Sequence, residues 1–524
     1  MKKNRDNHEP TRRDFLRQSA CASLGVTGLV NALAQMRLMT AAMAQLPPSS
    51  EYKALICLFL NGGNDSNNLL VPAGTALTSG LRADYETGRG ILAIPGNTLH
   101  ALNVPTTTAA FNHHHGGTKY PLGVHNEAPG LASLFNDGDL AFVANVGTLA
   151  HPFANRSEYL TVPAKRPIQL FSHSDQQSQW QSSVSDKPFT SGWGGRAADL
   201  LNASYNASTS KVSMSVSLAG INSFQVGTAG GLTQYVLGSS GTLPIVGFNS
   251  VNNDNNPYDL AALEGTTNGQ VNYKNTPEGV RLKMFDDIMK YASANLHEKE
   301  FGRILANSRK TEQTVGGAIL DATSNSGVNF DAIFTAAGAT TSLALQLKMI
   351  AKLIAGRSHL GNNRQIFFCQ VGGYDNHTSL ISAHGTLIKE LNNSLSAFAT
   401  TLKGLGVWDN VVTYTASDFN RTFTPNASQG SDHAWGGHAI VMGGAVNGGD
   451  IYGNYPTLKT GAVSTSIDVD AGRGRWIPST SVDQYSAVMA KWMGVQSTAM
   501  DAIFPNLYRF DDPYTVTTSN LAFL

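Results

Sequence analysis

The sequence predicts an α/β protein built on a mostly parallel β-sheet. Short apolar runs with the length of buried strands alternate with amphipathic helical segments. The chain has 524 residues, which is enough to bury a large core. Strands that alternate with helices favour a sheet that is covered by helices on both faces.

The predicted strands are continuous apolar runs, as expected for strands that are buried on both faces. We expect strands at Leu55–Leu60, Leu140–Val146, Ile366–Val371, Val411–Thr415 and Ala439–Met442.

The predicted helices carry apolar residues every three to four positions. Ser382–Gly406 is the longest of them, and Thr341–Gly356 is another. Thr276-Pro277 opens a third helix, because proline suits a first turn, and its expected apolar side holds Val280, Met284 and Ile288.

Residues 1–44 have the organisation of an export signal. Thr11-Arg12-Arg13-Asp14-Phe15-Leu16-Arg17 resembles the twin-arginine pattern, a weakly apolar segment follows, and Ala42-Met43-Ala44 forms a cleavage site. We expect the twin-arginine translocon to deliver the mature chain to the periplasm or the medium. The alternative is a chance arginine pair before a first helix.

Residues 45–524 are expected to form one domain. Residues 201–259 depart from the strand–helix rhythm and are rich in Asn, Ser, Thr and Gly. We interpret them as a β- and loop-rich insertion, such as an antiparallel flap near the active site.

Charge and hydropathy exclude some classes of partner. Lys+Arg and Asp+Glu both number 37, so no basic field favours nucleic acid. After the signal no apolar run reaches the length of a membrane span, so we expect no stable span. Cys57 and Cys369 lie in strand-like runs and are expected to be free, buried thiols.

Carboxylates and imidazoles collect next to the predicted strands. Ligands of open parallel sheets bind at the carboxyl ends of the strands, and Asp and His are ligands of divalent metals. We therefore predict a metal or anion site at this edge, where two ions of Zn, Mn, Ca or Mg would suit this many ligands. Each side chain also has a structural interpretation as a cap, an ion pair or a hydrogen-bonded loop residue. The predicted ligands are Asp65, Asp375, His377, Asp418, His433 and His438.

Four long motifs stand out: ICLFLNGGNDSNNLLVP, FSHSDQQSQW, GGYDNHTS and SDFNRTFTPNASQGSDHAWGGHAIVMGGAVNGGDIYGNYP. With the leader, they resemble the bacterial family called domain of unknown function 1501. That family is grouped with the alkaline phosphatase and sulfatase superfamily. The resemblance implies an α/β/α sandwich and a metal-dependent hydrolase of phosphate or sulfate esters.

The resemblance transfers unevenly to single residues. It implies metal ligands at Asp65, Asp375, His377 and Asp418, and a final histidine at His433 or His438. The superfamily has Asp-His where this chain has Asp418-Phe419, so the Asp432-His433 loop would have to supply the imidazole.

The nucleophile is the least specific part of the pattern. The Cys/Ser-x-Pro-Ser-Arg motif of sulfatases is absent from the sequence. Ser157 before a predicted helix is the candidate nucleophile, with Thr148, His151 and a metal-bound water as rivals. Arg421 is expected to grip the transferred group. His173, Asp175 and Gln177 are expected near the pocket without an assigned role, and His113-His114-His115 in an exposed loop.

The sequence thus predicts an exported metal-dependent hydrolase that acts on a small-molecule or polymer ester. The alternative is a non-catalytic envelope binding or assembly protein on a hydrolase-like fold. A redox enzyme is disfavoured because the sequence lacks a cofactor motif.

Overall fold

The computed structural model describes residues 51–74, 80–104, 121–206, 210–228, 231–242, 263–267, 270–290, 311–312, 314–461, 469–513 and 520–524. The predicted export signal and the three consecutive histidines at 113–115 lie outside these residues.

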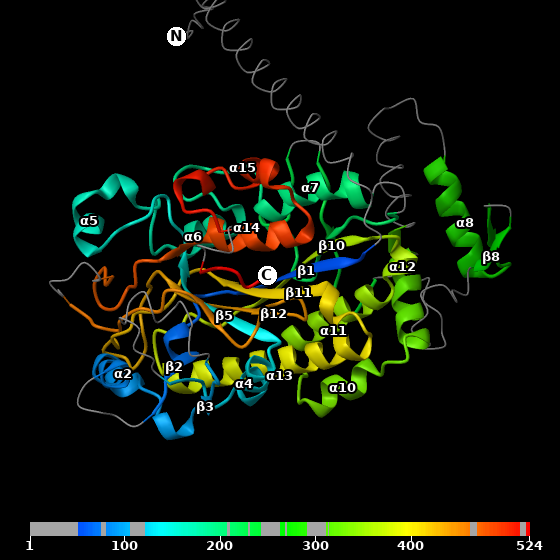
Figure 1. Ribbon diagram of the computed structural model, residues 1–524. Helices are drawn as coiled ribbons and strands as arrows, with labels where there is room; N and C mark the ends of the chain where they lie inside the picture. The colour runs from blue at the N-terminus through cyan, green and yellow to red at the C-terminus, as the bar shows by residue number, and fades with distance from the viewer. Residues whose placement is uncertain are drawn as a thin grey trace, which may run out of the picture. The chain divides into compact units, whose positions relative to one another are not determined.

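A mixed, mostly parallel sheet of nine strands forms the centre of the fold (Figure 1). Strands β11, β1, β10, β6 and β7 are parallel neighbours, and β12 runs antiparallel between β11 and β5. Two further strands, β13 and β14, pair in parallel with β5. The nine strands are β1 (Lys53–Leu60), β5 (Leu140–Gly147), β6 (Ser215–Ser217), β7 (Tyr235–Val236), β10 (Arg364–Val371), β11 (Val411–Ser417), β12 (Gly437–Met442), β13 (Ile451–Gly453) and β14 (Thr480–Ser481).

The five predicted strands are confirmed as β1, β5, β10, β11 and β12, and so is the α/β class with a mostly parallel sheet. In β1 every residue after the first is buried, which explains its unbroken apolar sequence. Leu60 pairs with Val371 of β10 and with Ser417 of β11. The carboxyl ends of these three strands therefore lie at one edge of the sheet, where the antiparallel β12 begins.

Helices cover both faces of the sheet (Figure 1). On one face α14 packs against β1 and β5, α7 against β10, and α6 against β11; on the other, α11 packs against β10 and α4 against β5. The first group is α6 (His173–Ser182), α7 (Trp193–Tyr205), α14 (Val482–Met493) and α15 (Met500–Ile503), and the second is α4 (Pro129–Asn136), α10 (Phe330–Ala336), α11 (Ser342–Ala355) and α13 (Leu380–Gly404).

Among the predicted helices, α11 and α13 lie where the sequence places them, and their apolar stripes are buried. The helix opened by Pro277 is α8 (Pro277–Lys290), whose Val280, Met284 and Ile288 are exposed, although Leu282 is buried. Shorter helices are α2 (Leu81–Arg89), α5 (Arg156–Thr161) and α12 (Arg357–Leu360).

The segment expected as an antiparallel insertion is partly built into the main sheet. β6 and β7 extend the parallel run next to β10, so this part of the expectation is wrong. Residues 243–259 of the segment lie outside the described residues. Small antiparallel sheets are formed instead by β2 (Leu70–Pro72), β3 (His100–Ala101) and β4 (Leu122–Val124), and by β8 (Leu263–Thr267) and β9 (Gln270–Tyr273).

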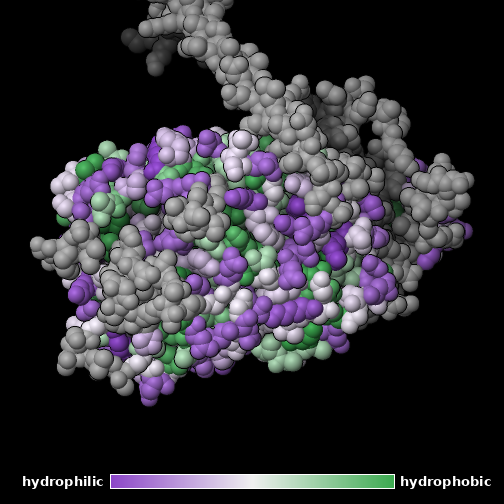
Figure 2. Space-filling view, viewed as in Figure 1, coloured by the Kyte–Doolittle hydropathy of each residue, from purple (hydrophilic) through white to green (hydrophobic). Residues whose placement is uncertain are grey.

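On the face shown in Figure 2, hydrophilic and hydrophobic residues are interspersed. Within the described part of the chain, no helix has the combination of length and hydrophobicity that crossing a bilayer requires. The two cysteines of these residues, Cys57 and Cys369, are free and buried, as expected.

Candidate metal centre

Side chains from two loops and one helix meet at this edge of the sheet. Asp375 and His377 follow β10, and His433 precedes β12, as the sequence predicts. They are joined by His173, the first residue of α6. One ligand atom each from His173, Asp375 and His433 lies within 4.8 Å of the other two.

The separations within this group suit a single ion. The His173 Nε2 atom lies 3.1 Å from His433 Nε2 and 3.4 Å from Asp375 Oδ1, and His433 Nε2 lies 3.5 Å from Asp375 Oδ1. Two ligands of a tetrahedral zinc ion are about 3.3 Å apart. His377 adjoins the group, because its Nε2 is 3.0 Å from Asp375 Oδ1 and 3.2 Å from His433 Nε2.

Each imidazole has an acceptor at its Nδ1 atom. The acceptor is Asp418 Oδ2 at 2.6 Å for His173, Asp432 Oδ1 at 3.2 Å for His377, and the Phe171 carbonyl at 2.8 Å for His433. With the proton on Nδ1, each Nε2 carries a lone pair. Neighbouring Nε2 lone pairs at 3.1 and 3.2 Å repel each other unless a cation or a shared proton lies between them.

Charges around the group keep its carboxylates ionised. Burial opposes ionisation of Asp375, but Arg421 and the nearby histidines hold its pKa below the ordinary value. Burial also opposes ionisation of Asp432, yet hydrogen bonds from Arg473, Asn426 and His377 lower its pKa to about 2. The hydrogen bond to Asp418 raises the pKa of His173, whereas burial lowers that of His433.

Asp418 contacts an imidazole of the group, which differs from its predicted role as a metal ligand. Its side chain is fully buried and accepts hydrogen bonds from His173, from Gln177 Nε2 at 2.9 Å and from the Gly62 amide at 3.2 Å. A carboxylate in this position fixes the tautomer and the direction of a metal-binding imidazole. The motif that contains His173 and Gln177 therefore belongs to the site.

Phe419 stands where the implied superfamily has a histidine. Its ring centroid lies 4.6 Å from those of both His173 and His433, so it packs against the imidazoles. The imidazoles of His433, from the Asp432-His433 loop, and of His173 lie together with Asp375 in this group. The sequence could not place His173 in this group because it lies 245 positions from Asp418.

Arg421 is not available to grip a substrate, so its predicted role is wrong. The side chain is fully buried, and it donates to the carbonyls of Gly62, Gly63 and Ser431 at 2.7, 3.0 and 3.2 Å. It also forms an ion pair with Asp375 Oδ1. Arg421 therefore fixes the loop and the carboxylate instead of the transferred group.

Asp65 does not join the group, which corrects its predicted role as a ligand. Its side chain is buried, pairs with Arg89 and accepts a hydrogen bond from Asn67 Nδ2 at 3.1 Å. Arg89 is fully buried and neutralises the carboxylate. The polar residues after β1 thus form an internal network.

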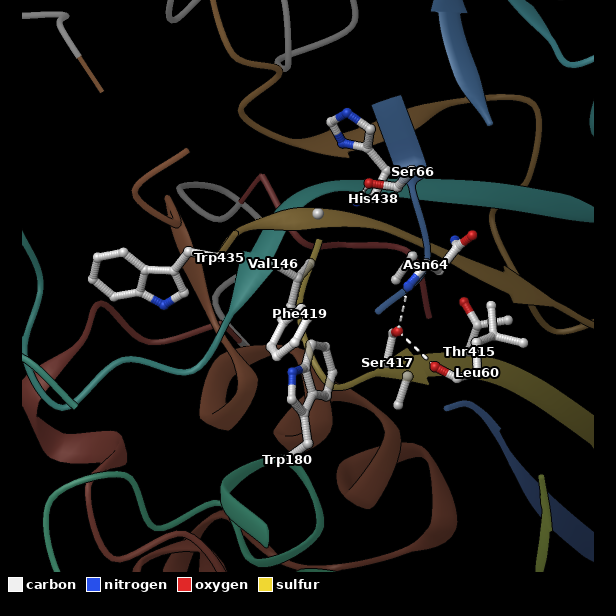
Figure 3. A pocket seen from close by; sticks show the side chains of 13 residues that line it. Leu60, Asn64, Ser66, Val146, Trp180, Thr415, Ser417, Phe419, Trp435 and His438 are labelled. Atoms are coloured by element: carbon white, nitrogen blue, oxygen red, sulfur yellow. Dashed lines mark hydrogen bonds between the residues drawn. The ribbon is translucent and has the colours of Figure 1, made fainter. Parts of the chain in front are cut away.

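His438 also lies apart from the group, contrary to prediction. Its ring stacks on Tyr455 at 4.7 Å, its Nδ1 accepts a hydrogen bond from the Asn145 amide, and burial lowers its pKa to about 3. It borders a small cavity with Asn64, Ser66 and others (Figure 3). Phe419 lines this cavity as well as contacting the imidazoles.

The candidate nucleophiles make no described contact with the group. Ser157 is exposed in the first turn of α5, where Asn155 is the N-cap. Thr148 is buried and accepts a hydrogen bond from Gln176 Nε2 at 3.0 Å. His151 is partly exposed, and burial lowers its pKa. The structure therefore gives none of them the position of a nucleophile.

Comparison with known proteins gives one match. Residues 271–471 match the family described as “Protein of unknown function (DUF1501)”. No curated protein and no solved structure matches the chain. The matched region contains Asp375, His377, Asp418 and His433 but not His173. Over these residues the match supports the family resemblance that the motifs indicate, and the function of that family is unknown.

Proposed function

We propose that the protein is an exported, metal-dependent hydrolase of phosphate or sulfate esters. The observation that carries the proposal is the convergence of His173, Asp375 and His433, each held by a neighbour. Two or three imidazole nitrogens with one carboxylate suit zinc or a similar transition metal better than magnesium or calcium. The resemblance to the phosphatase and sulfatase superfamily supports the ester class.

A divalent ion at this position would polarise the ester and activate water. The protein's part is to hold the ligands in place. Asp418 and the Phe171 carbonyl direct His173 and His433, and Arg421 holds Asp375. Asp375 and His377 are 47% and 42% exposed, so an ester can approach from their side.

Export is proposed on the pattern of residues 1–44. A chain carried by the twin-arginine route folds before export, which would let it take up its metal in the cytoplasm. Substrates would then be met in the periplasm or outside the cell.

Elemental analysis of the exported protein tests the proposal. We expect stoichiometric transition metal in the native protein, loss of it in His173→Ala, and retention in His359→Ala, which changes an exposed histidine of α12. Circular dichroism checks that both variants are folded. The native protein should hydrolyse p-nitrophenyl phosphate or sulfate, and His173→Ala should not. A folded native protein without metal would contradict the proposal.

A second candidate is a non-catalytic envelope binding or assembly protein. It is favoured by Asp65, which pairs with Arg89 where the superfamily has a metal ligand, and by the exposed position of Ser157. A native protein that holds metal but cleaves neither ester in an otherwise competent assay would favour this candidate.

A further inference from the structure

Among the described residues, the candidate metal centre is exposed on the side of Asp375 and His377. Asp418 and Arg421 at its base are fully buried, and His173 and His433 are 29% and 27% exposed. On the exposed side, Asp375 contacts His377, His377 contacts Asp432, and Asp432 pairs with Arg473. The side chains of these four residues are 47%, 42%, 30% and 44% exposed, respectively. Arg473 is thus linked through Asp432 to His377 on this exposed side of the group.

The loop that carries Arg473 is fixed in position. The buried Asp470 accepts hydrogen bonds from the amides of Gly472, Gly474 and Arg475 at 2.7, 2.8 and 3.1 Å. Thr424 donates to the Arg473 carbonyl through its hydroxyl at 3.2 Å. Arg473 itself has a φ of 61°, a left-handed conformation that persists only where the surroundings impose it.

The guanidinium of Arg473 has donors to spare. One nitrogen donates to Asp432 Oδ2 at 2.6 Å, and a guanidinium carries five N–H donors. Among the described residues, Asp432 is its hydrogen-bonded partner. Arg475 lies beside the centre as well, because its Nε donates to the His433 carbonyl at 2.8 Å and its guanidinium lies 4.7 Å from the Phe171 ring.

We propose that Arg473, supported by Arg475, binds a second anionic group of the substrate. The substrate class is then an ester that carries another carboxylate, phosphate or sulfate next to the group that is cleaved. Arginine suits this role because its planar fork matches the paired oxygens of such groups. This inference rests on the proposed function, because the first anionic group is taken to bind at the metal centre.

Two phosphonates that an ester hydrolase cannot cleave provide the test. Phenylphosphonate and 4-carboxyphenylphosphonate differ by one carboxylate, and their dissociation constants can be measured by calorimetry on the metal-loaded protein. We expect the native protein to bind the carboxylated probe about ten-fold more tightly, as one charge-assisted contact implies. Arg473→Gln should bind both probes equally, and Arg473→Lys should keep part of the difference.

Arg509→Gln is the matched control. Arg509 also pairs with a carboxylate, that of Asp186, but neither residue belongs to the chain of contacts around the candidate metal centre. It should keep the ten-fold difference. If Arg473 only held Asp432 and His377 in place, Arg473→Gln would lower the affinity for both probes by the same factor. That result would overturn the inference. It would also be overturned if the native protein bound the two probes equally or bound neither.

Failure of the hydrolase proposal has a different readout. An Arg473-dependent preference in a protein that cleaves neither p-nitrophenyl ester would leave the anion site standing and would count against the hydrolase proposal. A preference that Arg473→Gln leaves intact, in a protein that does cleave them, would overturn only the anion site.

Discussion

At the scale of single residues, a side chain can bind a metal only if its ligand atoms are not already held by hydrogen bonds or ion pairs within the protein. Asp418 has the residue type of a ligand, but its oxygens are taken by His173, Gln177 and Gly62. Asp65 is likewise engaged, by Arg89. A sequence shows the residue types but not these partners, because the partners come from distant parts of the chain.

Asp418→Asn should weaken metal binding without unfolding the protein. An amide can donate as well as accept, so it no longer holds His173 with the proton on Nδ1. Loss of such an outer partner typically lowers metal affinity by about 10- to 100-fold. Zinc affinity measured by chelator competition checks this.

The control for this substitution is Asp175→Asn. Asp175 lies in the first turn of α6, as His173 does, but accepts a hydrogen bond from the Ser172 hydroxyl. The affinity of Asp175→Asn for zinc should equal that of the native protein. Equal affinities in both variants would show that Asp418 does not orient a ligand.

At the scale of elements, the strands set the position of the centre. Gly62, in the turn after β1, lets that turn approach the loop after β10 closely. The apolar runs were sufficient to predict the five strands, and the ends of β10 and β11 could be placed at one edge. The antiparallel direction of β12 and the short strands β6 and β7 could not be predicted, because strand direction depends on pairing. The apolar residues of α8 that the sequence pattern predicts to be buried are exposed for a similar reason: a helical periodicity does not show which element, if any, packs against the helix.

Gly62→Ala should be much more destabilising than an ordinary glycine substitution. Gly62 has a φ of 113°, and an added Cβ would lie 2.6 Å from the Asp375 amide nitrogen. Gly138 has a φ of 83° with nothing within 4 Å of an added Cβ, so Gly138→Ala carries only the backbone cost of about 1–2 kcal/mol. Urea unfolding should show the larger loss for Gly62→Ala, and its zinc affinity should fall. Equal losses in the two variants would contradict a close approach of the loops.

At the scale of the whole molecule, stability depends on several buried titratable groups. Burial raises the pKa of Asp483 in α14 to about 7, against lowering contributions from Ser183 and Arg196. Burial lowers the pKa of His125, His384 and His438 to about 3. The histidines stabilise the fold above the unfolded pKa of 6.5, and that contribution is lost as the pH falls. The contribution of Asp483 has the opposite sign.

The pH dependence of Asp483→Asn isolates this carboxyl group. Because its folded pKa exceeds the unfolded value of 3.8, its contribution is fully present below pH 3.8 and is lost as the pH rises through 7. The free energy of unfolding of Asp483→Asn relative to the native protein should therefore rise by about 1.4 kcal/mol for each pH unit between pH 4 and 7. Urea unfolding at several pH values measures it. A difference that does not change with pH would refute a raised pKa.

We expect a metal ion between the imidazoles of His173 and His433 and the carboxylate of Asp375. Anomalous diffraction from crystals of the metal-loaded protein, recorded on both sides of the metal absorption edge, tests it most directly. We expect one peak about 2.0–2.2 Å from the Nε2 atoms of both histidines and from an oxygen of Asp375. A well-ordered centre without a peak, or a peak bound by other residues, would contradict it.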